Sequence, residues 1–547
     1  SGGGGWATAV VSGGRRVRVR PMGERAFLAE VDSLAEVLFL HAALTAARLE
    51  AVGDLVPAAR TVLIPFDPAR VPAATVRAWV ESTWAERSDA PTAGAPVSGG
   101  PATPVILDIA YDGPDLAETA DLLGLGPGEL AERHERAEWT VAFTGFAPGF
   151  GYLTSPDWTF EVPRLETPRT RVPEGAVGLA GGFSGAYPRE TPGGWRLIGT
   201  TAAPLFDPSA ARPALLSPGD RVKFRGVSAG ARAVSVAAGE PPASVPQSRS
   251  APAAIEVRDP GLFATVQDLG RSGHASIGVA RSGALDRQAL RIANRLVGNP
   301  ERTAGVEVTM GGFRAVAERD LWIAVTGGFG PIAIDGDPVD PCVAHAWPRG
   351  SELAIGWLEH GARAYVAVRG GVEAGGGDAN TSAVLGSLAT DSLAGLGPDP
   401  LRAGTRLGVG RSPQTPVPAL DVAPWGAPSD ELELALAPGP RADWFEASAL
   451  LPLFDAVWTV SDAADRVGVR LDGPELARAT SGELPSEGMV PGAIQVPPGG
   501  RPTVLLADGP VTGGYPVIAV VTDDSLDALG QARPGTRIRF RHARPHP

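Results

Sequence analysis

The sequence predicts a mainly β protein in which a small N-terminal α/β sandwich, with α+β character, precedes β-barrel domains. Its 547 residues include 71 Gly and 53 Pro, which disfavour helical bundles and favour short strands joined by turns. Hydrophobic residues make up 44% of the chain, enough to bury a core in each of three or four domains. Regular short strands between Gly/Pro turns are typical of barrels rather than of a doubly wound sheet.

The first domain is expected at residues 15–90, after a tail at residues 1–14. Ser33 and Glu36 have the spacing of a capping box, so a helix is predicted to begin after Ser33. The expected elements are strands at 16–20 and 26–31, this helix, a strand at 62–65 and a helix at 73–86. We expect this domain to serve packing or contact between subunits.

A linker at residues 229–254 divides the rest of the chain. It has small residues, four prolines and no apolar period, and it separates two halves that could once have been two proteins. One barrel is predicted before the linker, at 105–228. Two barrels are predicted after it, at 255–411 and at 430–543. Their clearest elements are a strand at 105–111, helices at 114–123, 127–136 and 285–296, and strands near 255–258, 305–309, 321–326, 353–357 and 363–368.

Charge and composition exclude several classes of function. The formal net charge is −13 and no block of basic residues occurs, which argues against a nucleic-acid groove or an anionic membrane surface. Cys342 is the only cysteine, so neither an intramolecular disulfide nor a multi-cysteine metal site can form, and no metal ligands are assigned. No apolar run reaches the ~18 residues of a membrane span and no signal pattern opens the chain, so cytoplasm is expected.

The chain contains a single lysine, Lys223. A phosphate loop of the G-x-x-x-x-G-K-[ST] type is therefore excluded, because its lysine is missing. Covalently bound biotin is not expected either, because Lys223 is not flanked by methionines and lies in the alternating run Arg221 to Arg225. We expect it to be a solvated strand residue.

Two glycine-, proline- and arginine-rich regions, near 143–199 and 486–518, are the first candidates for chemistry. Phe143-Thr-Gly-Phe-Ala-Pro-Gly-Phe-Gly-Tyr152 places three glycines and a proline among four aromatics. Such glycines cost backbone entropy, which is justified where the backbone approaches a ligand closely. A tight barrel corner with aromatic packing explains the loop equally well.

Arg169, Arg171 and Arg189 lie among rigid prolines and could clamp a carboxylate or phosphate, because guanidinium binds such groups bidentately. Surface ion pairing with Glu174 or Glu190 is the alternative. His134 could act as a general base, although a histidine at a helix end is more often a cap or a solvated residue.

Comparable loops occur in the second half. They are Thr265-Val-Gln-Asp-Leu-Gly-Arg271, Ser486-Glu-Gly-Met-Val-Pro-Gly-Ala-Ile-Gln495 and Thr512-Gly-Gly-Tyr-Pro516. Their acid and amide side chains could hold an amide or carboxylate substrate. Equally, they could be turn residues that bond to their own backbone.

These motifs resemble a known pair of proteins. Gly145-Phe-Ala-Pro-Gly-Phe-Gly-Tyr-Leu153, Pro168-Arg-Thr-Arg-Val-Pro173 and Pro192-Gly-Gly-Trp195 resemble the family called allophanate-hydrolase subunit 1, sporulation-kinase inhibitor or the B subunit of 5-oxoprolinase. Thr265–Arg271, Glu487-Gly488 with Pro491–Pro497, and Thr512–Pro516 resemble its companion, called allophanate-hydrolase subunit 2 or the C subunit of 5-oxoprolinase. The resemblance runs from about residue 15 to 542, in the order B then C.

The resemblance implies cyclophilin-like β-barrels in the later part of the B half and in both parts of the C half. It also implies ATP-dependent opening of 5-oxoproline, a lactam, to L-glutamate with a separate A subunit of 5-oxoprolinase. ATP and Mg²⁺ are the implied cofactors, although no recognised nucleotide-binding signature is present. The expected partners are this A subunit, on a separate chain, and a small lactam or amide substrate. Neither nucleic acid nor a membrane is expected as a partner, and the chain could form a homo-oligomer.

The resemblance carries site residues onto this chain. His134 matches the histidine before the family's Gly-Phe-x-Pro-Gly-Phe loop, and it is assigned a catalytic role together with Asp268 and Glu487. The residues assigned to substrate binding are Phe146, Pro148, Gly149, Tyr152, Arg169, Arg189, Gly194, Gln267, Arg271, Gln495, Gly513, Gly514 and Tyr515.

Other functions compete with the oxoprolinase. The same two-part module resembles the carboxyltransferase region of urea carboxylase, which moves CO₂ from carboxybiotin to an amide nitrogen, here with a separate biotin carrier. A regulator of a histidine kinase is a third alternative, although an inhibitor fused to its antagonist would be a poor switch. Allophanate hydrolase is weakest, because the Ser-Ser-Lys arrangement of amidases needs a lysine that this chain hardly supplies.

Overall fold

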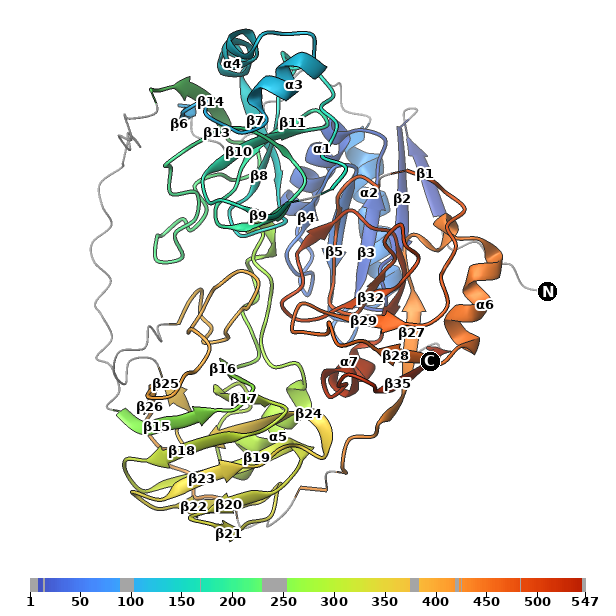
Figure 1. Cartoon of the computed structure of the whole chain (residues 1–547). Coiled ribbons are helices and arrows are strands. Elements are labelled where there is room, and N and C mark those ends of the chain that lie inside the picture. Colours follow the sequence, from blue (N-terminus) through green and yellow to red (C-terminus); the bar gives the residue numbers. More distant parts are fainter. Residues whose placement is uncertain are drawn as a thin grey trace, which may run out of the picture.

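The computed structural model arranges the chain in four lobes (Figure 1). It describes residues 8–12, 15–88, 103–167, 169–228, 253–373, 383–418, 423–424, 426–482 and 484–543. The small N-terminal domain and the last barrel lie side by side on the right of Figure 1, while the remaining lobes lie above and below. Most of the predicted linker at 229–254 falls outside the described residues, and Ala253 and Ala254 already belong to a strand. The mainly β fold class with an α+β start is confirmed.

The N-terminal domain is a five-stranded sheet of order β1-β2-β3-β5-β4 with two helices. Ser33 and Glu36 form the predicted capping box at the start of α1. The predicted tail at 1–14 is wrong in part, since residues 8–12 pair with β2 as an antiparallel edge strand. The elements are β1 (Thr8–Ser12), β2 (Arg15–Pro21), β3 (Ala26–Glu30), α1 (Leu34–Ala46), β4 (Val56–Pro57), β5 (Thr61–Pro65) and α2 (Ala73–Ser88).

Both faces of this sheet are buried. Alternate residues of a strand point to opposite sides, and each side packs against a different part of the protein. Phe27 and Ala29 of β3 pack with the helices. Ala26 and Leu28 pack instead against the last barrel, in one core with residues such as Val520. The small domain of the B half is thereby joined to the C half through an apolar interface.

The second lobe is a curved seven-stranded sheet of order β13-β10-β11-β8-β7-β14-β6. An isolated bridge between Ala110 and Thr200 joins its two edges, so the sheet nearly closes on itself. The elements are β6 (Val105–Ile109), α3 (Leu116–Leu122), α4 (Pro127–Arg136), β7 (Trp139–Thr144), β8 (Gly151–Thr154), β9 (Arg169–Val172), β10 (Ala176–Ala180), β11 (Phe183–Ala186), β12 (Thr191–Gly193), β13 (Arg196–Thr200) and β14 (Arg221–Gly226). Lys223 is exposed in β14, as expected.

The third lobe packs a seven-stranded and a five-stranded sheet over one apolar core. The elements are β15 (Ala253–Pro260), β16 (Phe263–Gln267), a 3₁₀ turn (Ala275–Ile277), α5 (Arg287–Leu296), β17 (Gly305–Thr309), β18 (Phe313–Ala317), β19 (Leu321–Phe329), β20 (Ile332–Ile334), β21 (Asp337–Pro338), β22 (Ala344–Trp347), β23 (Glu352–Ile355), β24 (His360–Val368), β25 (Val372–Glu373) and β26 (Arg406–Val409). Asp286 caps α5 by accepting from the backbone N of Ala289 at 2.9 Å.

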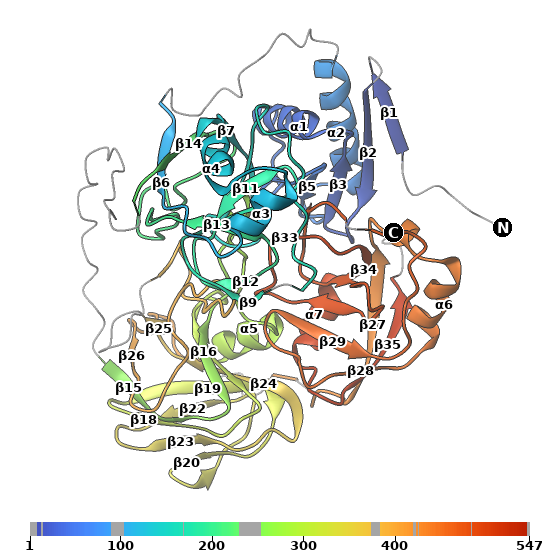
Figure 2. The ribbon, with the colours of Figure 1, turned by 45° about the horizontal axis from the view of Figure 1, so that its top comes forward.

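The fourth lobe is a closed barrel of order β27-β34-β31-β32-β29-β28-β35. Figure 2 shows it beside the N-terminal sheet from a second direction. The elements are β27 (Glu431–Pro438), a 3₁₀ turn (Ala442–Trp444), α6 (Ala447–Asp455), β28 (Trp458–Val460), β29 (Gly468–Asp472), β30 (Glu487–Gly488), β31 (Ala493–Gln495), β32 (Thr503–Leu505), β33 (Thr512–Gly513), β34 (Val517–Val521), α7 (Asp523–Gly530) and β35 (Arg537–His542). In the described part of the chain, no helix is both long and apolar enough to cross a membrane.

Candidate functional site

The loop between β7 and β8 lies against both lobes of the second half. Its Phe146 adopts a φ of 65°, and the backbone N of Phe146 donates to Thr512 Oγ1 at 2.8 Å. The backbone N of Gly149 donates to the carbonyl of Ile277 at 3.0 Å. The two loop regions predicted from the sequence, near 143–199 and 486–518, are therefore in direct contact.

Aromatic rings fill the barrel side of this contact. Phe150 packs edge-on against Tyr152, Tyr187 and Trp195, with ring centroids 5.0–5.3 Å apart. The Tyr152 hydroxyl interacts with Ser486 and Thr512, while burial raises the pKa of Tyr152. Pro148 is also buried in this loop. The loop thus serves as a packed corner, and the same corner joins the halves.

Replacing Gly145 with alanine is expected to lower the free energy of unfolding by about 1–3 kcal/mol, because overpacking displaces a neighbour. An added Cβ would lie 2.5 Å from Cγ2 of Thr512. Urea denaturation measures the effect. The control Gly128→Ala, in α4 with nothing within 4 Å, should be neutral or slightly stabilising. Equal stabilities for Gly145→Ala and the control would contradict the close contact.

Glu487 belongs to a buried ion-pair cluster, which does not fit the predicted catalytic role. Arg441 Nε lies 2.9 Å from Glu487 Oε1, and Arg441 Nη1 lies 3.2 Å from Glu30 Oε2. Burial lowers the pKa of Arg441, but its hydrogen bonds and the charges of Glu487 and Glu30 outweigh burial and raise it. Arg20 pairs with Glu30 at 2.7 Å. The cluster links the small domain to the last barrel.

The remaining predicted residues of the last barrel lie near one another. Gln495 Nε2 contacts Met489 Sδ at 3.3 Å, and a Cβ on Gly513 would lie 2.6 Å from that nitrogen. Gly514 follows directly, and Tyr515 is 45% exposed. Burial lowers the pKa of Arg478, and the Tyr515 hydroxyl opposes that shift. Tyr515 is therefore available to a ligand or a partner.

A second contact between the halves surrounds residues 387–397. Arg189, from the loop after β11, lies close to Gly395. A Cβ added to Gly395 would be 2.7 Å from Arg189 Nη1. Arg271 is 2% exposed and donates to the carbonyl of Ala389. Gln267 Nε2 donates to the carbonyl of Thr390 at 2.9 Å.

Four polar atoms of this cluster are buried without a hydrogen-bond partner in the described structure. They are Arg189 Nε, Arg271 Nη1, Gln267 Oε1 and Asp391 Oδ2. Burial raises the pKa of Asp391 to about 6, and the charge of Asp508 adds to that shift. Buried polar groups are nearly always satisfied, so a group of unsatisfied ones indicates a place for a ligand or water. We take this cluster of four residues as the candidate site. Asp391 lies in no motif that the sequence revealed, because its role depends on the fold around it.

Asp268 borders this cluster but is fully engaged. Its Oδ1 accepts from the N of Gly270 at 2.7 Å and from Ser387 Oγ at 2.6 Å, and its Oδ2 accepts from the N of Leu388 at 2.8 Å. The side chain holds two loops together. This placement fits the turn alternative better than the predicted catalytic role.

Arg169 and Arg171 are separated from the cluster by their own ion pairs. Arg169 Nη2 lies 2.6 Å from Asp115 Oδ1, although its Nη1 is buried without a partner. Arg171 pairs with Glu190 at 2.5 Å on the surface. Gly194 accepts a backbone hydrogen bond from Leu165 at 2.9 Å. Arg169 and Arg171 thus pair with carboxylates of their own half, whereas Arg189 lies against Gly395 of the second half.

His134 lies inside the second lobe and is fully buried, a placement that fits a structural role better than the predicted role as a general base. Its Nδ1 is 2.9 Å from the Tyr111 hydroxyl, and its Nε2 is 2.8 Å from Ser184 Oγ. Its ring packs on Phe224 with centroids 4.3 Å apart. Both ring nitrogens are engaged, so we assign His134 a structural role.

His134 should make stability pH-dependent. Burial lowers its pKa to about 3 from the ordinary histidine value of 6.5, so between these values the unfolded chain binds a proton that the native chain does not. The free energy of unfolding should fall as the pH drops below 6.5, by at most about 1.4 kcal/mol per pH unit. Between about pH 7.5 and about pH 5.5, the decrease in the free energy of unfolding should be ~1 kcal/mol smaller in His134→Gln than in the unmodified chain. Identical losses in the two proteins would contradict this.

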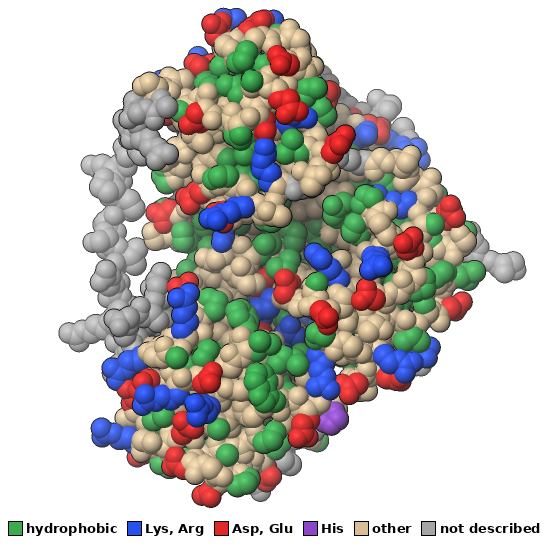
Figure 3. Space-filling model, in the orientation of Figure 1, with side chains coloured by type: hydrophobic (Ala, Val, Ile, Leu, Met, Phe, Trp, Pro, Cys, Tyr) green, Lys and Arg blue, Asp and Glu red, His purple; other side chains and the backbone are tan. Residues whose placement is uncertain are grey.

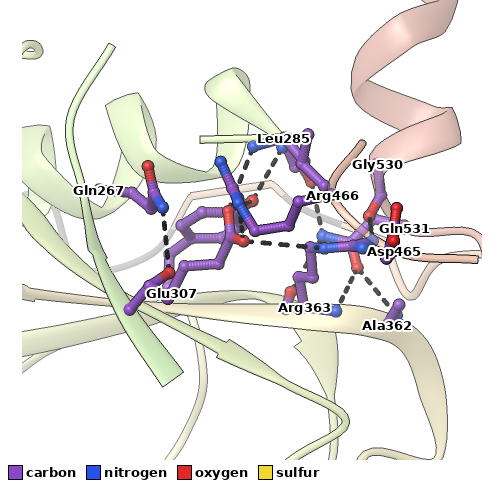
Figure 4. Close-up of polar contacts among 12 residues, drawn as sticks. Gln267, Leu285, Glu307, Ala362, Arg363, Asp465, Arg466, Gly530 and Gln531 are labelled. Carbon is purple, nitrogen blue, oxygen red and sulfur yellow. Dashed lines mark hydrogen bonds and ion pairs between the residues drawn. The ribbon is translucent and has the colours of Figure 1, made fainter. Parts of the chain in front are cut away.

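A polar clamp that the sequence did not reveal joins the third and fourth lobes (Figure 4). Arg466 is 3% exposed; its Nη1 lies 2.5 Å from Glu307 Oε1 and its Nε lies 3.0 Å from Asp508 Oδ2. Glu307 Oε2 also accepts from the Tyr365 hydroxyl at 2.8 Å. Arg363 and Gln531 extend the contact, because the backbone N of Arg363 donates to Gln531 Oε1 at 3.0 Å.

A cavity of about 950 Å³ lies between the small domain, the loop at 271–291 and the last barrel. Figure 3 shows this face of the molecule hollowed at its centre, with basic and acidic side chains in the hollow. Of the predicted site residues, Arg271 lines the cavity. Among the described residues, no group of three or more His, Cys, Asp or Glu is placed to hold a metal ion, so no Mg²⁺ site is assigned within this chain.

Comparisons with known proteins agree with the two-part organisation. Residues 17–216 match the carboxyltransferase domain, subdomain C and D, and residues 277–542 match the carboxyltransferase domain, subdomain A and B. The crystal structure of TTHA0988 superposes with a TM-score of 0.78 at 35% identity, and the match covers 94% of this chain and 99% of that one.

Other relatives each match about half of the chain or less. The C subunit of 5-oxoprolinase from Escherichia coli (strain K12) is 35% identical over 285 residues, covering 51% of this chain and 88% of that protein. The B subunit of 5-oxoprolinase from Escherichia coli O157:H7 is 49% identical over 112 residues, covering 20% of this chain and 51% of that protein. The urea amidolyase of Saccharomyces cerevisiae (strain ATCC 204508 / S288c) is 33% identical over 316 residues, covering 53% of this chain and 16% of that protein.

Proposed function

This chain belongs to the carboxyltransferase-domain family, with a half similar to the B subunit of 5-oxoprolinase before a half similar to the C subunit, and from this premise we propose that it supplies the B and C components of an ATP-dependent 5-oxoprolinase. A separate A subunit would complete the enzyme, which would open 5-oxo-L-proline to L-glutamate. The observation that carries the proposal is the candidate site itself. It is built from Arg189 of the B-like half and from Gln267, Arg271 and Asp391 of the C-like half.

The unpartnered atoms of this site complement 5-oxoproline. Arg189 Nε and Arg271 Nη1 are donors, while Gln267 Oε1 and Asp391 Oδ2 are acceptors. The lactam offers a carboxylate and a carbonyl to the donors, and its N–H to an acceptor. Charge-assisted contacts from arginine to a carboxylate are the strong ones, so an anionic amide is favoured over neutral urea.

ATP, when bound, would activate the lactam oxygen by phosphoryl transfer, which makes the ring carbonyl more susceptible to attack. The two arginines would hold the substrate carboxylate and keep the ring in one orientation. Gln267 would receive the lactam N–H, because its Nε2 is already used by Thr390 and its Oε1 is free. We propose that Mg²⁺ accompanies the nucleotide, with ligands that the A subunit or the nucleotide supplies.

The purified chain, mixed with the A subunit, ATP, Mg²⁺ and 5-oxoproline, should release glutamate. The controls omit the A subunit or ATP in turn and should give no glutamate. Absence of turnover with all components present would reject the proposal.

A carboxyltransferase that acts on a urea-like amide is the second candidate, because the urea amidolyase of S. cerevisiae is 33% identical to this chain over 316 residues, close to the 35% over 285 residues of the C subunit of 5-oxoprolinase. A separate biotin carrier would be required, since the chain's lysine is an exposed strand residue. Incubation with carboxylated biotin carrier and urea tests it: carboxylated urea without glutamate formation from 5-oxoproline would favour this candidate.

A further inference from the structure

The 950 Å³ cavity is far larger than a lactam of nine heavy atoms requires, and it falls in the range of drug- or nucleotide-sized sites. Three lobes form its walls, so it exists only when the halves are assembled. Its floor is apolar and comes from the shared core of the small domain and the last barrel, including Met22, Leu63, Met489 and Val511. Such a floor can accept a flat apolar group.

Arginines line the rim, and some of them are neutralised. Arg25 and Arg287 both pair with Asp523, at 2.6 Å and 2.7 Å. Arg25 also reaches Asp67 at 3.3 Å, and Arg287 reaches Asp527 at 2.8 Å. These two arginines and their carboxylates therefore hold the walls together and leave little charge for a ligand.

Other rim arginines keep their charge available. Arg48 and Arg281 are exposed, and neither forms an ion pair in the described part of the chain, although Arg281 Nε donates to the carbonyl of Leu269 at 3.2 Å. Arg291 is 3.7 Å from Glu301, a loose pair. Six arginines line the cavity, against four acidic residues, namely Glu24, Asp54, Asp67 and Asp523. The cavity thus has an excess of positive charge in a protein whose net charge is −13.

Arg271 connects this cavity to the candidate site. It lines the cavity and is 2% exposed, and its Nη1, assigned above to the substrate carboxylate, has no hydrogen-bond partner among the described residues. A buried guanidinium nitrogen without an acceptor is costly, so an acceptor from a ligand would remove that cost.

We propose that this cavity binds a phosphate-bearing ligand of nucleotide size, with its phosphates on Arg48 and Arg281 and its apolar part on the floor. Guanidinium groups suit phosphate because they donate two parallel hydrogen bonds. The cavity and its charges stand on the structure alone, whereas the choice of ATP as the probe rests on the proposed function.

Isothermal titration of the full chain with ATP, with and without Mg²⁺ and the A subunit, tests the site. Arg48→Gln/Arg281→Gln should weaken ATP binding about tenfold or more, because two charge-assisted contacts are lost. Both arginines are exposed, so the fold should be retained. The control Arg470→Gln/Arg539→Gln removes the same charge from exposed strand positions outside the cavity and should bind ATP as the unmodified chain does.

Adenosine and inorganic tripolyphosphate separate the two parts of the ligand. Tripolyphosphate should bind more weakly than ATP because it lacks the apolar group, and adenosine more weakly still. Absence of ATP binding in every mixture, or equal affinity in the rim variant and the control, would overturn the site. If ATP binding is weakened in the rim variant but no glutamate is formed, the cavity site is supported and the oxoprolinase is rejected. If glutamate is formed but ATP binding is equal in the rim variant and the control, the cavity site is rejected and the oxoprolinase is supported.

Discussion

Arg466→Met is expected to lower the free energy of unfolding by about 3–5 kcal/mol, because buried Asp508 loses its ion pair and Glu307 keeps only Arg363, at 3.8 Å. Glu307 is 1% exposed and Asp508 is fully buried, and both depend on the Arg466 guanidinium. The loss should appear in urea denaturation of the full chain, followed by tryptophan fluorescence. Burial lowers the pKa of Arg466, but the charges of Asp508 and Glu307 outweigh burial and raise it, so it is charged at any working pH.

Two further proteins show whether charge or packing is responsible. Arg221→Met removes an exposed pair with Glu138, at 2.6 Å, and should cost less than about 1 kcal/mol. Adding Asp508→Asn to Arg466→Met should recover part of the stability, because it removes the carboxylate that lost its ion pair, while Glu307 still faces Arg363 at 3.8 Å. If Arg466→Met is as mild as Arg221→Met, the clamp does not hold the two lobes together.

Arg271→Gln is expected to raise the KM for 5-oxoproline by about tenfold to a hundredfold, as the loss of one hydrogen bond to a charged group of the substrate. The change in kcat should be small, since a carboxylate remote from the ring carbonyl is bound alike in ground and transition states. Activity is measured with the A subunit, ATP and Mg²⁺, and the free energy of unfolding is measured alongside.

A substrate without a carboxylate makes this test specific. Binding of 2-pyrrolidinone should be weak and equally weak in the unmodified chain and in Arg271→Gln. The control Arg402→Gln, exposed in the same lobe, should leave both constants unchanged. An unchanged KM in Arg271→Gln would show that Arg271 only supports the loop through its bonds to Ala389 and Val384.

Local patterns were sufficient for much of the fold. The capping box at Ser33, the strand at 305–309 and the helix that ends near Leu296 depend on neighbouring residues, and each lies where it was expected. The edge strand at 8–12 was missed because β1 is held by pairing with β2, a contact that glycine-rich flanking sequence does not signal.

The candidate site was only partly accessible in this way. Gln267, Arg271 and Arg189 could be selected from their motifs, but Asp391 lies in a segment without one. His134 and Glu487 were assigned to chemistry because motif position says nothing of burial. In the structure His134 is enclosed by Tyr111, Ser184 and Phe224. Glu487 is neutralised by Arg441.

The sequence by itself determined the mainly β class and the absence of a lysine-based phosphate loop or biotin attachment. These follow from composition, periodicity and residue identity, which are properties of short stretches. The order of the two halves followed from the resemblance of their motifs to a known family. Only the tertiary structure decided that Phe146 meets Thr512, that Arg189 joins Arg271 and Asp391, and that three lobes enclose a cavity. Such contacts join residues hundreds of positions apart, and their energies come from burial and pairing that no local pattern records.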